Sequence, residues 1–141
     1  MRSALFALAA GCLVPICASA AELAVGQTRA CQSGPEKQLY VTVGAIDYYG
    51  EGRAAVSVSI FNRAPNALYP RVAHAPLDAD TLTASCPTVV DQPIALAPGY
   101  EHAYQRWRAD PVSAFTLSIE QIYDIVVEQV SKAHQGGPNA P

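Results

Sequence analysis

Several residue types are scarce in this chain, and each scarcity argues against a class of protein. Of the 141 residues, 15% are charged, and the chain has one Met, one Trp and three Phe. Because the single Met is residue 1, a copper site built from several thioethers is excluded. The nine Lys and Arg are outnumbered by twelve Asp and Glu and form no basic stripe, so nucleic-acid binding is not indicated.

Motifs of the common catalytic classes are also missing. The sequence holds no Gly-x-Ser-x-Gly elbow, no His-Glu-x-x-His metal motif and no phosphate-binding Walker loop. We therefore predict no catalytic residue, no cofactor and no metal site. These absences favour a protein that is not an enzyme.

The one long apolar run stands at the start of the chain. It covers residues 4–16, follows Arg2, and precedes three small residues at positions 18–20 that signal peptidase accepts. At 13 residues the run is too short to span a bilayer, which needs about 20. The pattern predicts an export signal over residues 1–20, and hence a periplasmic or secreted protein without a membrane span.

A lipoprotein signal is the alternative, because Cys12 follows a short run of small residues. The position three residues before Cys12 is Ala9, where a lipobox usually has Leu, and Cys17 directly follows the bulky Ile16. Both features favour cleavage after Ala20 instead.

Cleavage there leaves about 121 residues, enough for one hydrophobic core and too few for two. We place a single globular domain over residues 21–133 and a disordered tail over residues 134–141. Loss of Arg2 leaves eight basic residues against twelve acidic ones, a net charge of −4.

The cysteine count points to one disulfide. Two of the four cysteines lie in the export signal, so the exported chain keeps only Cys31 and Cys86. The pair is too far apart in sequence for a redox motif and lacks the further Cys or His of a metal site. We predict a Cys31–Cys86 disulfide, whose 56-residue loop is worth about 4 kcal/mol on the chain-entropy model.

Alternating apolar and polar residues predict a β-rich fold. Residues 39–48 and 55–60 flank a glycine-containing turn and read as an antiparallel hairpin, in which the second strand has one apolar face and one small polar face. A strand over residues 68–73 belongs at an edge or a bulge, because Pro70 cannot donate a ladder hydrogen bond. Further short strands are predicted over residues 82–86, 93–96 and 100–107.

The period changes to that of a helix near the C-terminus. Apolar residues recur there at spacings of 3, 1, 3, 1 and 3, namely Ile119, Ile122, Tyr123, Val126, Val127 and Val130. Ser118 followed by Gln121 fits a capping box, so we predict a helix over residues 118–133. Residues 114–117 have two possible structures. They form a strand that leads into this helix, or they belong to a longer helix that starts at Asp110.

These elements predict an α+β domain: mainly antiparallel β, as a sheet or small sandwich of short strands, with one C-terminal amphipathic helix and one disulfide. The pattern resembles immunoglobulin-like sandwiches in general terms only. Those domains place a Trp between their two cysteines, whereas Trp107 follows Cys86 here.

One segment suggests a contact surface. If residues 100–107 form a strand, then Tyr100, His102, Tyr104 and Arg106 project from one face. Tyr and Arg are enriched at binding hot spots, so we predict these four as binding residues for a protein partner.

A second aromatic group, Tyr48 and Tyr49, lies at the predicted hairpin tip. The alternative for all of these rings is that they cover sheet edges and serve the fold.

We therefore expect an exported, non-catalytic binding or accessory protein, such as an envelope adaptor, an assembly factor or an inhibitor of a secreted enzyme. The alternative is a small exported enzyme or metal-binding protein that uses His74 or His102. His74 has Asp78 and Asp80 close by in sequence, beyond a turn that Pro76 would make, whereas His102 has no such cluster.

The export signal gives a direct prediction. N-terminal sequencing of the exported protein should begin at Ala21, because the small residues before it meet the requirement of signal peptidase. A lipid-modified Cys12, or an exported chain that keeps Arg2, would contradict it.

Overall fold

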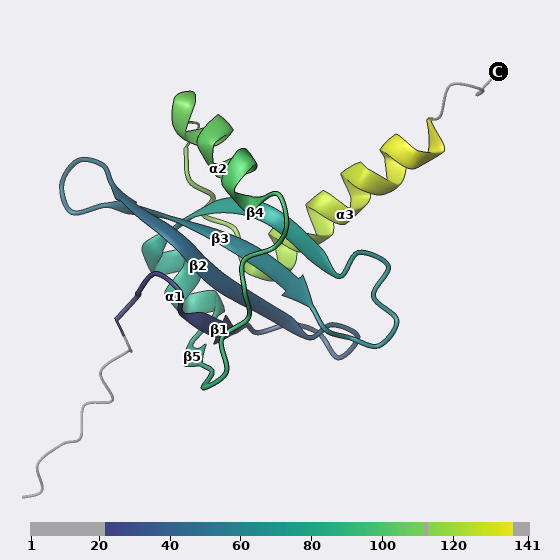
Figure 1. Cartoon of the computed structure of the whole chain (residues 1–141). Coiled ribbons are helices and arrows are strands. Elements are labelled where there is room, and N and C mark those ends of the chain that lie inside the picture. The colour runs from purple at the N-terminus through teal and green to yellow at the C-terminus, as the bar shows by residue number, and fades with distance from the viewer. Residues whose placement is uncertain (1–21, 112, 137–141) are drawn as a thin grey trace, which may run out of the picture.

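The computed structural model describes residues 22–111 and 113–136, so the predicted export signal lies outside the described residues. In this part of the chain five strands form one antiparallel sheet in the order β4-β3-β2-β1-β5, and three helices surround it (Figure 1). In chain order the elements are β1 (Thr28–Ala30), β2 (Leu39–Tyr48), β3 (Ala54–Asn62), β4 (Arg71–Asp78), α1 (Ala79–Ser85), β5 (Thr88–Val89), α2 (Tyr100–Ala109) and α3 (Ile119–Gln135). The small α+β fold predicted from the sequence is confirmed, with three helices in place of one.

The predicted hairpin is formed by β2 and β3. These strands pair from Leu39 opposite Asn62 to Tyr48 opposite Ala54, with one register shift between Val43 and Ala45. The turn residues Gly50, Glu51 and Gly52 all have positive φ angles, of 50°, 47° and 75°. Two glycines suit this turn because they adopt such angles without a steric penalty.

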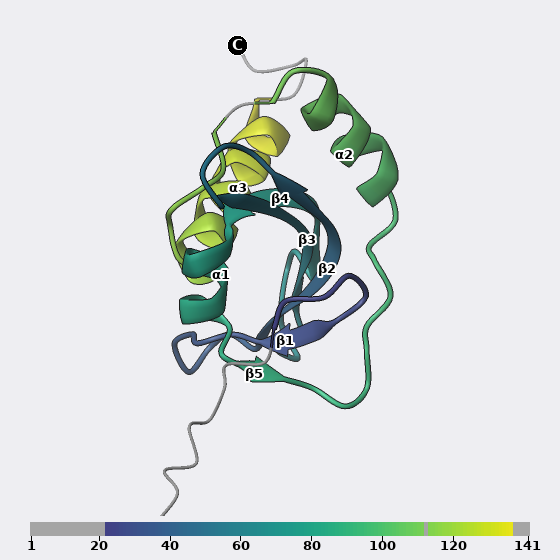
Figure 2. The ribbon, with the colours of Figure 1, turned by 90° about the vertical axis from the view of Figure 1, so that its left-hand side faces the viewer.

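The main hydrophobic core lies on one face of the sheet. The sheet is curled, with α1 and the start of α3 against its concave side (Figure 2). Burial of these side chains removes apolar area from water at roughly 25 cal/mol per Å², which makes this face the main source of stability. The fully or almost fully buried members include Val41, Val43, Val56, Val58, Ile60, Leu77, Leu82, Ile119 and Ile122.

The opposite face of the sheet is small and polar, as the sequence pattern of β3 predicts, and it is also buried. The Ser57 and Ser59 side chains are fully buried. Ser59 Oγ accepts a hydrogen bond from the backbone N–H of Ala97 at 3.0 Å, and Thr42 Oγ1 donates to the Ile94 carbonyl at 2.8 Å. The segment before α2 therefore lies across this face and bonds to the Thr42 and Ser59 hydroxyls, whereas the Ser57 hydroxyl pairs with His74 of β4.

Three of the predicted short strands are wrong. Residues 82–86 lie largely in helix α1, because the Asp78 carboxylate caps its first turn by accepting from Thr81 N at 3.3 Å. Residues 93–96 lie in no strand, and the strand predicted over residues 100–107 is helix α2.

Two other predictions hold in part. The edge strand predicted at residues 68–73 exists as β4, which starts at Arg71, directly after Pro70, and lies at one edge of the sheet. Residues 114–117 form no full strand, but Phe115 forms a single parallel bridge with Leu77 of β4.

The predicted disulfide between Cys31 and Cys86 is confirmed. It joins the chain after β1 to the end of α1, and the buried side chain of Arg29 lies beside it. Arg29 Nε donates to the Cys86 carbonyl at 2.6 Å, and its guanidinium also reaches Gln27 Oε1 at 2.9 Å. A covalent bond and charge-assisted hydrogen bonds thus hold the same corner of the fold.

Helix α3 begins as the sequence predicts, with a complete capping box between Ser118 and Gln121. Lys37 Nζ ties its first turns to the body of the protein, 3.1 Å from Glu120 Oε1 and 2.9 Å from Asp124 Oδ1. The helix continues to Gln135, beyond the predicted end at residue 133, and residues 137–141 of the predicted tail lie outside the described residues.

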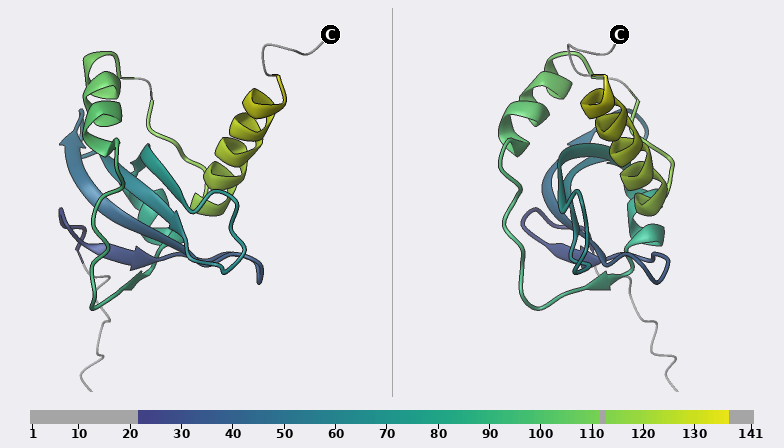
Figure 3. Two further views of the ribbon diagram at one scale, coloured as in Figure 1. Left: turned by 45° about the vertical axis from the view of Figure 1, so that its right-hand side comes forward. Right: turned by 90° about the vertical axis from the view of Figure 1, so that its right-hand side faces the viewer.

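Burial along α3 falls from its start to its end. Ile119 and Ile122 are buried, whereas Val126 and Val130 are only half-buried, so the predicted stripe is a core element chiefly in its first half. The second half projects away from the sheet (Figure 3). Within the described residues, no helix is both long enough and apolar enough to cross a membrane.

Two isoleucines in the first half of α3 test which of its faces is buried. Ile122→Ala should cost about 2–5 kcal/mol of unfolding free energy, because it opens a cavity among buried side chains. The matched control is Ile125→Ala, whose side chain is 43% exposed and whose loss should cost less than about 1 kcal/mol. Urea unfolding of both variants gives the two values. Equal costs would show that the face of α3 that carries Ile122 is not the buried one.

Candidate functional site

The four predicted binding residues lie on helix α2, where they do not share a face. Tyr100 and Tyr104 are buried against the sheet, while His102 and Arg106 are exposed on the other side of the helix. A helix turns by about 100° per residue, so residues two apart point in different directions. The expected row of four side chains is therefore corrected to an inner pair and an outer pair.

Helix signals for this segment are present in the sequence. Pro98 and Gly99 precede the helix, and Gly99 adopts a φ of 85° at the N-cap position. Glu101 lies in the first turn and Arg106 and Arg108 in the last, the order that suits the helix dipole. Alternation of Tyr100, His102, Tyr104 and Arg106 fits a strand equally well, which is why the prediction failed.

The inner face of α2 forms a cluster of aromatic rings around His74 of β4. Ring centroids of Tyr100, Tyr104 and Trp107 lie 5.7, 6.0 and 5.9 Å from the centroid of His74. Tyr100 and Tyr104 are stacked on each other at 5.7 Å. Such ring pairs add about 0.5–1.5 kcal/mol each beyond the area they bury.

Gly44 of β2 makes room for this cluster. A Cβ atom built at Gly44 would overlap the ring of Tyr100. Gly44 is also the unpaired residue at the register shift of β2 against β3. The bulge and the missing side chain together let α2 approach the sheet closely.

Both tyrosines of the cluster stay neutral near physiological pH. Burial raises the pKa of Tyr100, and the nearby Tyr104, Glu101 and Asp47 raise it further. Among the described residues the buried Tyr100 Oη has no hydrogen-bond partner; the neighbouring Ser57 hydroxyl, which opposes this pKa shift, is engaged with His74 instead. Burial also raises the pKa of Tyr104, whose hydroxyl donates to Asp47 Oδ2 at 2.9 Å.

Within the described residues, the hydrogen-bond partner of His74 is a buried serine. His74 Nε2 and Ser57 Oγ are 3.0 Å apart, but the Ser57 side chain is fully buried and no substrate can reach it. Asp78 caps α1 and Asp80 is exposed on that helix, so neither contacts His74. Among the described residues, no three His, Cys, Asp or Glu side chains come together as metal ligands.

Next to the ring cluster lies a pocket of about 350 Å³, which we call the hairpin–α2 pocket. It opens between the C-terminal end of α2 and the tip of the β2–β3 hairpin. Its volume falls in the range typical of binding sites, about 300–1,000 Å³. The pocket is lined by Asp47, Tyr49, Ala55, Trp107, Arg108, Pro111, Ser113 and Ala114.

Sequence reasoning identified part of this pocket. Tyr49 belongs to the aromatic pair singled out at the hairpin tip, and its neighbour Tyr48 is 79% exposed. A strand over residues 100–107 would instead direct Trp107 to the face opposite Tyr100, and Arg108 lies beyond that predicted strand. The aromatic spacing from Tyr100 to Tyr104 and Trp107, of four and three residues, is the signal that would have placed Trp107 correctly.

Comparisons of this chain with protein-family models, with curated proteins and with solved structures found no significant match.

The environment of His74 predicts a pH-dependent stability. Burial lowers the pKa of His74 below its ordinary value, so the folded state favours the neutral ring. Below about pH 6.5 the His74 ring takes up a proton more readily in the unfolded state than in the folded state. The free energy of unfolding should therefore fall as the pH drops below that value. Urea unfolding followed by the fluorescence of Trp107, the single Trp, measures this between about pH 8 and pH 5.

Two variants assign that dependence to a residue. His74→Gln should flatten the fall in stability on the acid side. His102→Gln, on the exposed side of α2, should keep the wild-type dependence. The assignment fails if the wild type and the His74 variant lose stability in parallel.

Proposed function

We propose that this protein is an exported, non-catalytic binding protein that contacts a protein partner through the hairpin–α2 pocket. The observation that carries the proposal is an open pocket of about 350 Å³ between Tyr49 and Trp107, beside Arg108. Tyr, Trp and Arg are the residue types that contribute most to binding energy in protein interfaces. An adaptor, an assembly factor or an inhibitor of a secreted enzyme would each use such a surface.

The lining of the pocket favours a neutral apolar group. Tyr49, Trp107 and Pro111 offer rings, while Asp47 and Arg108 carry opposite charges. One oxygen of Asp47 already accepts the hydroxyl of Tyr104, which fixes its orientation. A hydrophobic side chain of a partner would bury apolar area against the rings. The charged groups of Asp47 and Arg108 would stay in contact with polar groups around that side chain.

The surroundings of the pocket support an interface larger than the pocket itself. Tyr49, which lines the pocket and directly follows β2, is 44% exposed, and its neighbour Tyr48, the last residue of β2, is 79% exposed. Exposed aromatic groups that lie together mark interaction surfaces more often than isolated ones do. The hairpin tip therefore extends the contact area beyond α2.

A double substitution tests the proposal. Affinity capture from the exported fraction of the native host should compare three proteins. These are the wild-type domain, a double variant that combines Tyr49→Ala with Arg108→Ala, and the single variant Arg106→Ala as the matched control. The double variant should retain at least tenfold less partner, because hot-spot truncations cost about 2 kcal/mol or more. Arg106 lies on the outer side of the same helix, so its removal should leave capture unchanged.

Binding to the isolated partner provides the second measurement. Trp107 lies in the pocket, so titration with the purified partner should change its fluorescence saturably. Circular dichroism first establishes that each variant is folded. Equal capture by all three proteins, or an unchanged Trp107 signal on binding, would contradict the proposed site.

A further inference from the structure

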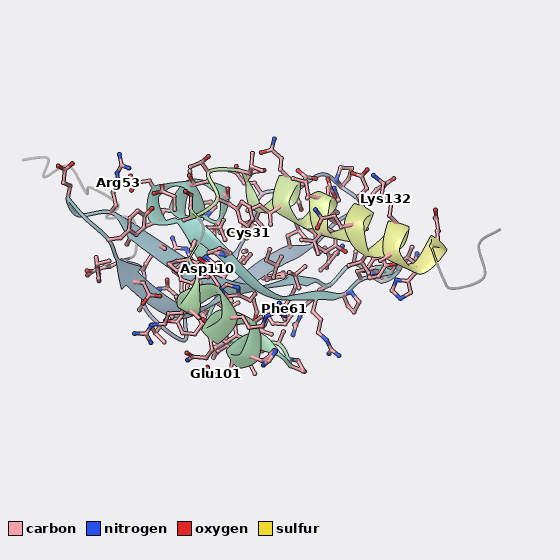
Figure 4. The ribbon with its side chains drawn as sticks, turned by 90° about the horizontal axis from the view of Figure 1, so that it is seen from above. Cys31, Arg53, Phe61, Glu101, Asp110 and Lys132 are labelled. Atoms are coloured by element: carbon pink, nitrogen blue, oxygen red, sulfur yellow. A yellow bond between two sulfur atoms is a disulfide. The ribbon has the colours of Figure 1, made fainter. Side chains whose placement is uncertain are left out.

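A second open groove, of about 510 Å³, lies at the other end of β3 and β4. Its walls include Phe61, Arg63 and Arg71 from the strand ends, and Ile94 and Leu96 from the segment that precedes α2. We call it the arginine groove. Figure 4 shows the separation from the hairpin tip, with Arg53 and Phe61 labelled at opposite ends of β3.

The charges in this groove are all of one sign. Arg63 and Arg71 are both exposed, and within the described residues neither guanidinium makes a hydrogen bond or an ion pair. No acidic residue is among the lining residues, although the whole chain carries a net charge of −3. Two unpaired guanidinium groups on one side of an acidic protein favour carboxylate ligands, which they bind through paired N–H donors.

The opposite wall offers free backbone groups. Residues 94–97 are held from beneath, because Ile94 N donates to Thr28 Oγ1 at 2.8 Å and Ala97 N donates to Ser59 Oγ at 3.0 Å. Between these anchors, the backbone N–H and C=O groups of Ala95 and Leu96 make no hydrogen bond within the described residues. Free backbone groups on a segment that is held at both ends can hydrogen-bond to the backbone of an extended peptide.

Apolar contacts complete the groove. Phe61 is half-buried beneath it, and Leu96 is 39% exposed at its rim. A peptide with alternating residues would place one set of side chains on this apolar floor and the other set toward the arginines.

We propose that the arginine groove binds an extended, acidic segment of a protein. The segment pairs its backbone with Ala95 and Leu96, directs carboxylates to Arg63 and Arg71, and rests apolar side chains on Phe61. This site goes beyond the proposed function, because it uses different residues from the hairpin–α2 pocket and lies at the other end of the sheet.

The probe is a fluorescein-labelled peptide of ten residues, alternating Glu and Val, with blocked ends. Fluorescence anisotropy should show saturable binding that weakens as salt is added. The same peptide with Gln in place of Glu should bind at least tenfold more weakly.

Charge-matched variants locate the site. Arg63→Gln with Arg71→Gln should weaken binding of the acidic peptide at least tenfold. The control, Arg53→Gln with Arg106→Gln, removes the same net charge from exposed positions elsewhere and should change binding less than twofold. Backbone amide shifts in two-dimensional NMR should be largest at Ala95 and Leu96.

Three results would overturn the proposal. Equal losses in the two double variants would show nonspecific attraction to net charge. Binding of a single-stranded DNA oligomer that matches the peptide in affinity would show a general polyanion site. Amide shifts concentrated at Trp107 and the hairpin would assign the peptide to the hairpin–α2 pocket, a result that leaves the proposed function standing.

Discussion

Strand β3 is buried along both of its faces, and the fold depends on how the second face is covered. On the concave side, Val56, Val58 and Ile60 meet the hydrophobic core. On the other side, Ser57 and Ser59 are too polar to be buried without partners, since an unsatisfied hydroxyl costs about 1–3 kcal/mol. His74 of β4 is the partner of Ser57, while Ser59 donates to the Ala73 carbonyl and accepts from Ala97 N. The segment over residues 94–97 and helix α2 cover these side chains. Both candidate binding surfaces lie where this cover ends, the pocket beyond the C-terminus of α2 and the groove before its N-terminus.

Features that rest on local chemistry were predictable from the sequence. Few alternatives exist for two strands with a glycine turn, for a capping box at Ser118, or for the pairing of Cys31 with Cys86. Helix α2 was not predictable in the same way, because its polar and aromatic residues fit two periods at once. The spacing of Tyr100, Tyr104 and Trp107 decides between them only when the face that they cover is known. The segment that covers Ser59 has no hydrophobic pattern in the sequence, because hydrogen bonds to its backbone hold it in place.

The candidate site was predictable only in its exposed part. Tyr48 and Tyr49 follow from the hairpin, because both directly precede its glycine-containing turn. Asp47 and Arg108 acquire their roles from the distance between the hairpin and α2, which depends on tertiary packing. The same holds for His74, whose neighbours come from a helix that starts 26 residues later in the chain. Residues that meet through long-range packing carry no sign of it in local sequence patterns.

The close approach of Tyr100 to Gly44 has a consequence for finding relatives. Any chain that docks α2 in this way, with a ring at the position of Tyr100, needs glycine at the bulge, because a side chain at the bulge would displace that ring. The two positions are coupled across 56 residues of sequence, independently of the residues around them. Glycine at one position and an aromatic residue at the other, between a hairpin strand and a following helix, thus form a two-point signature for distant homologues whose overall identity has faded.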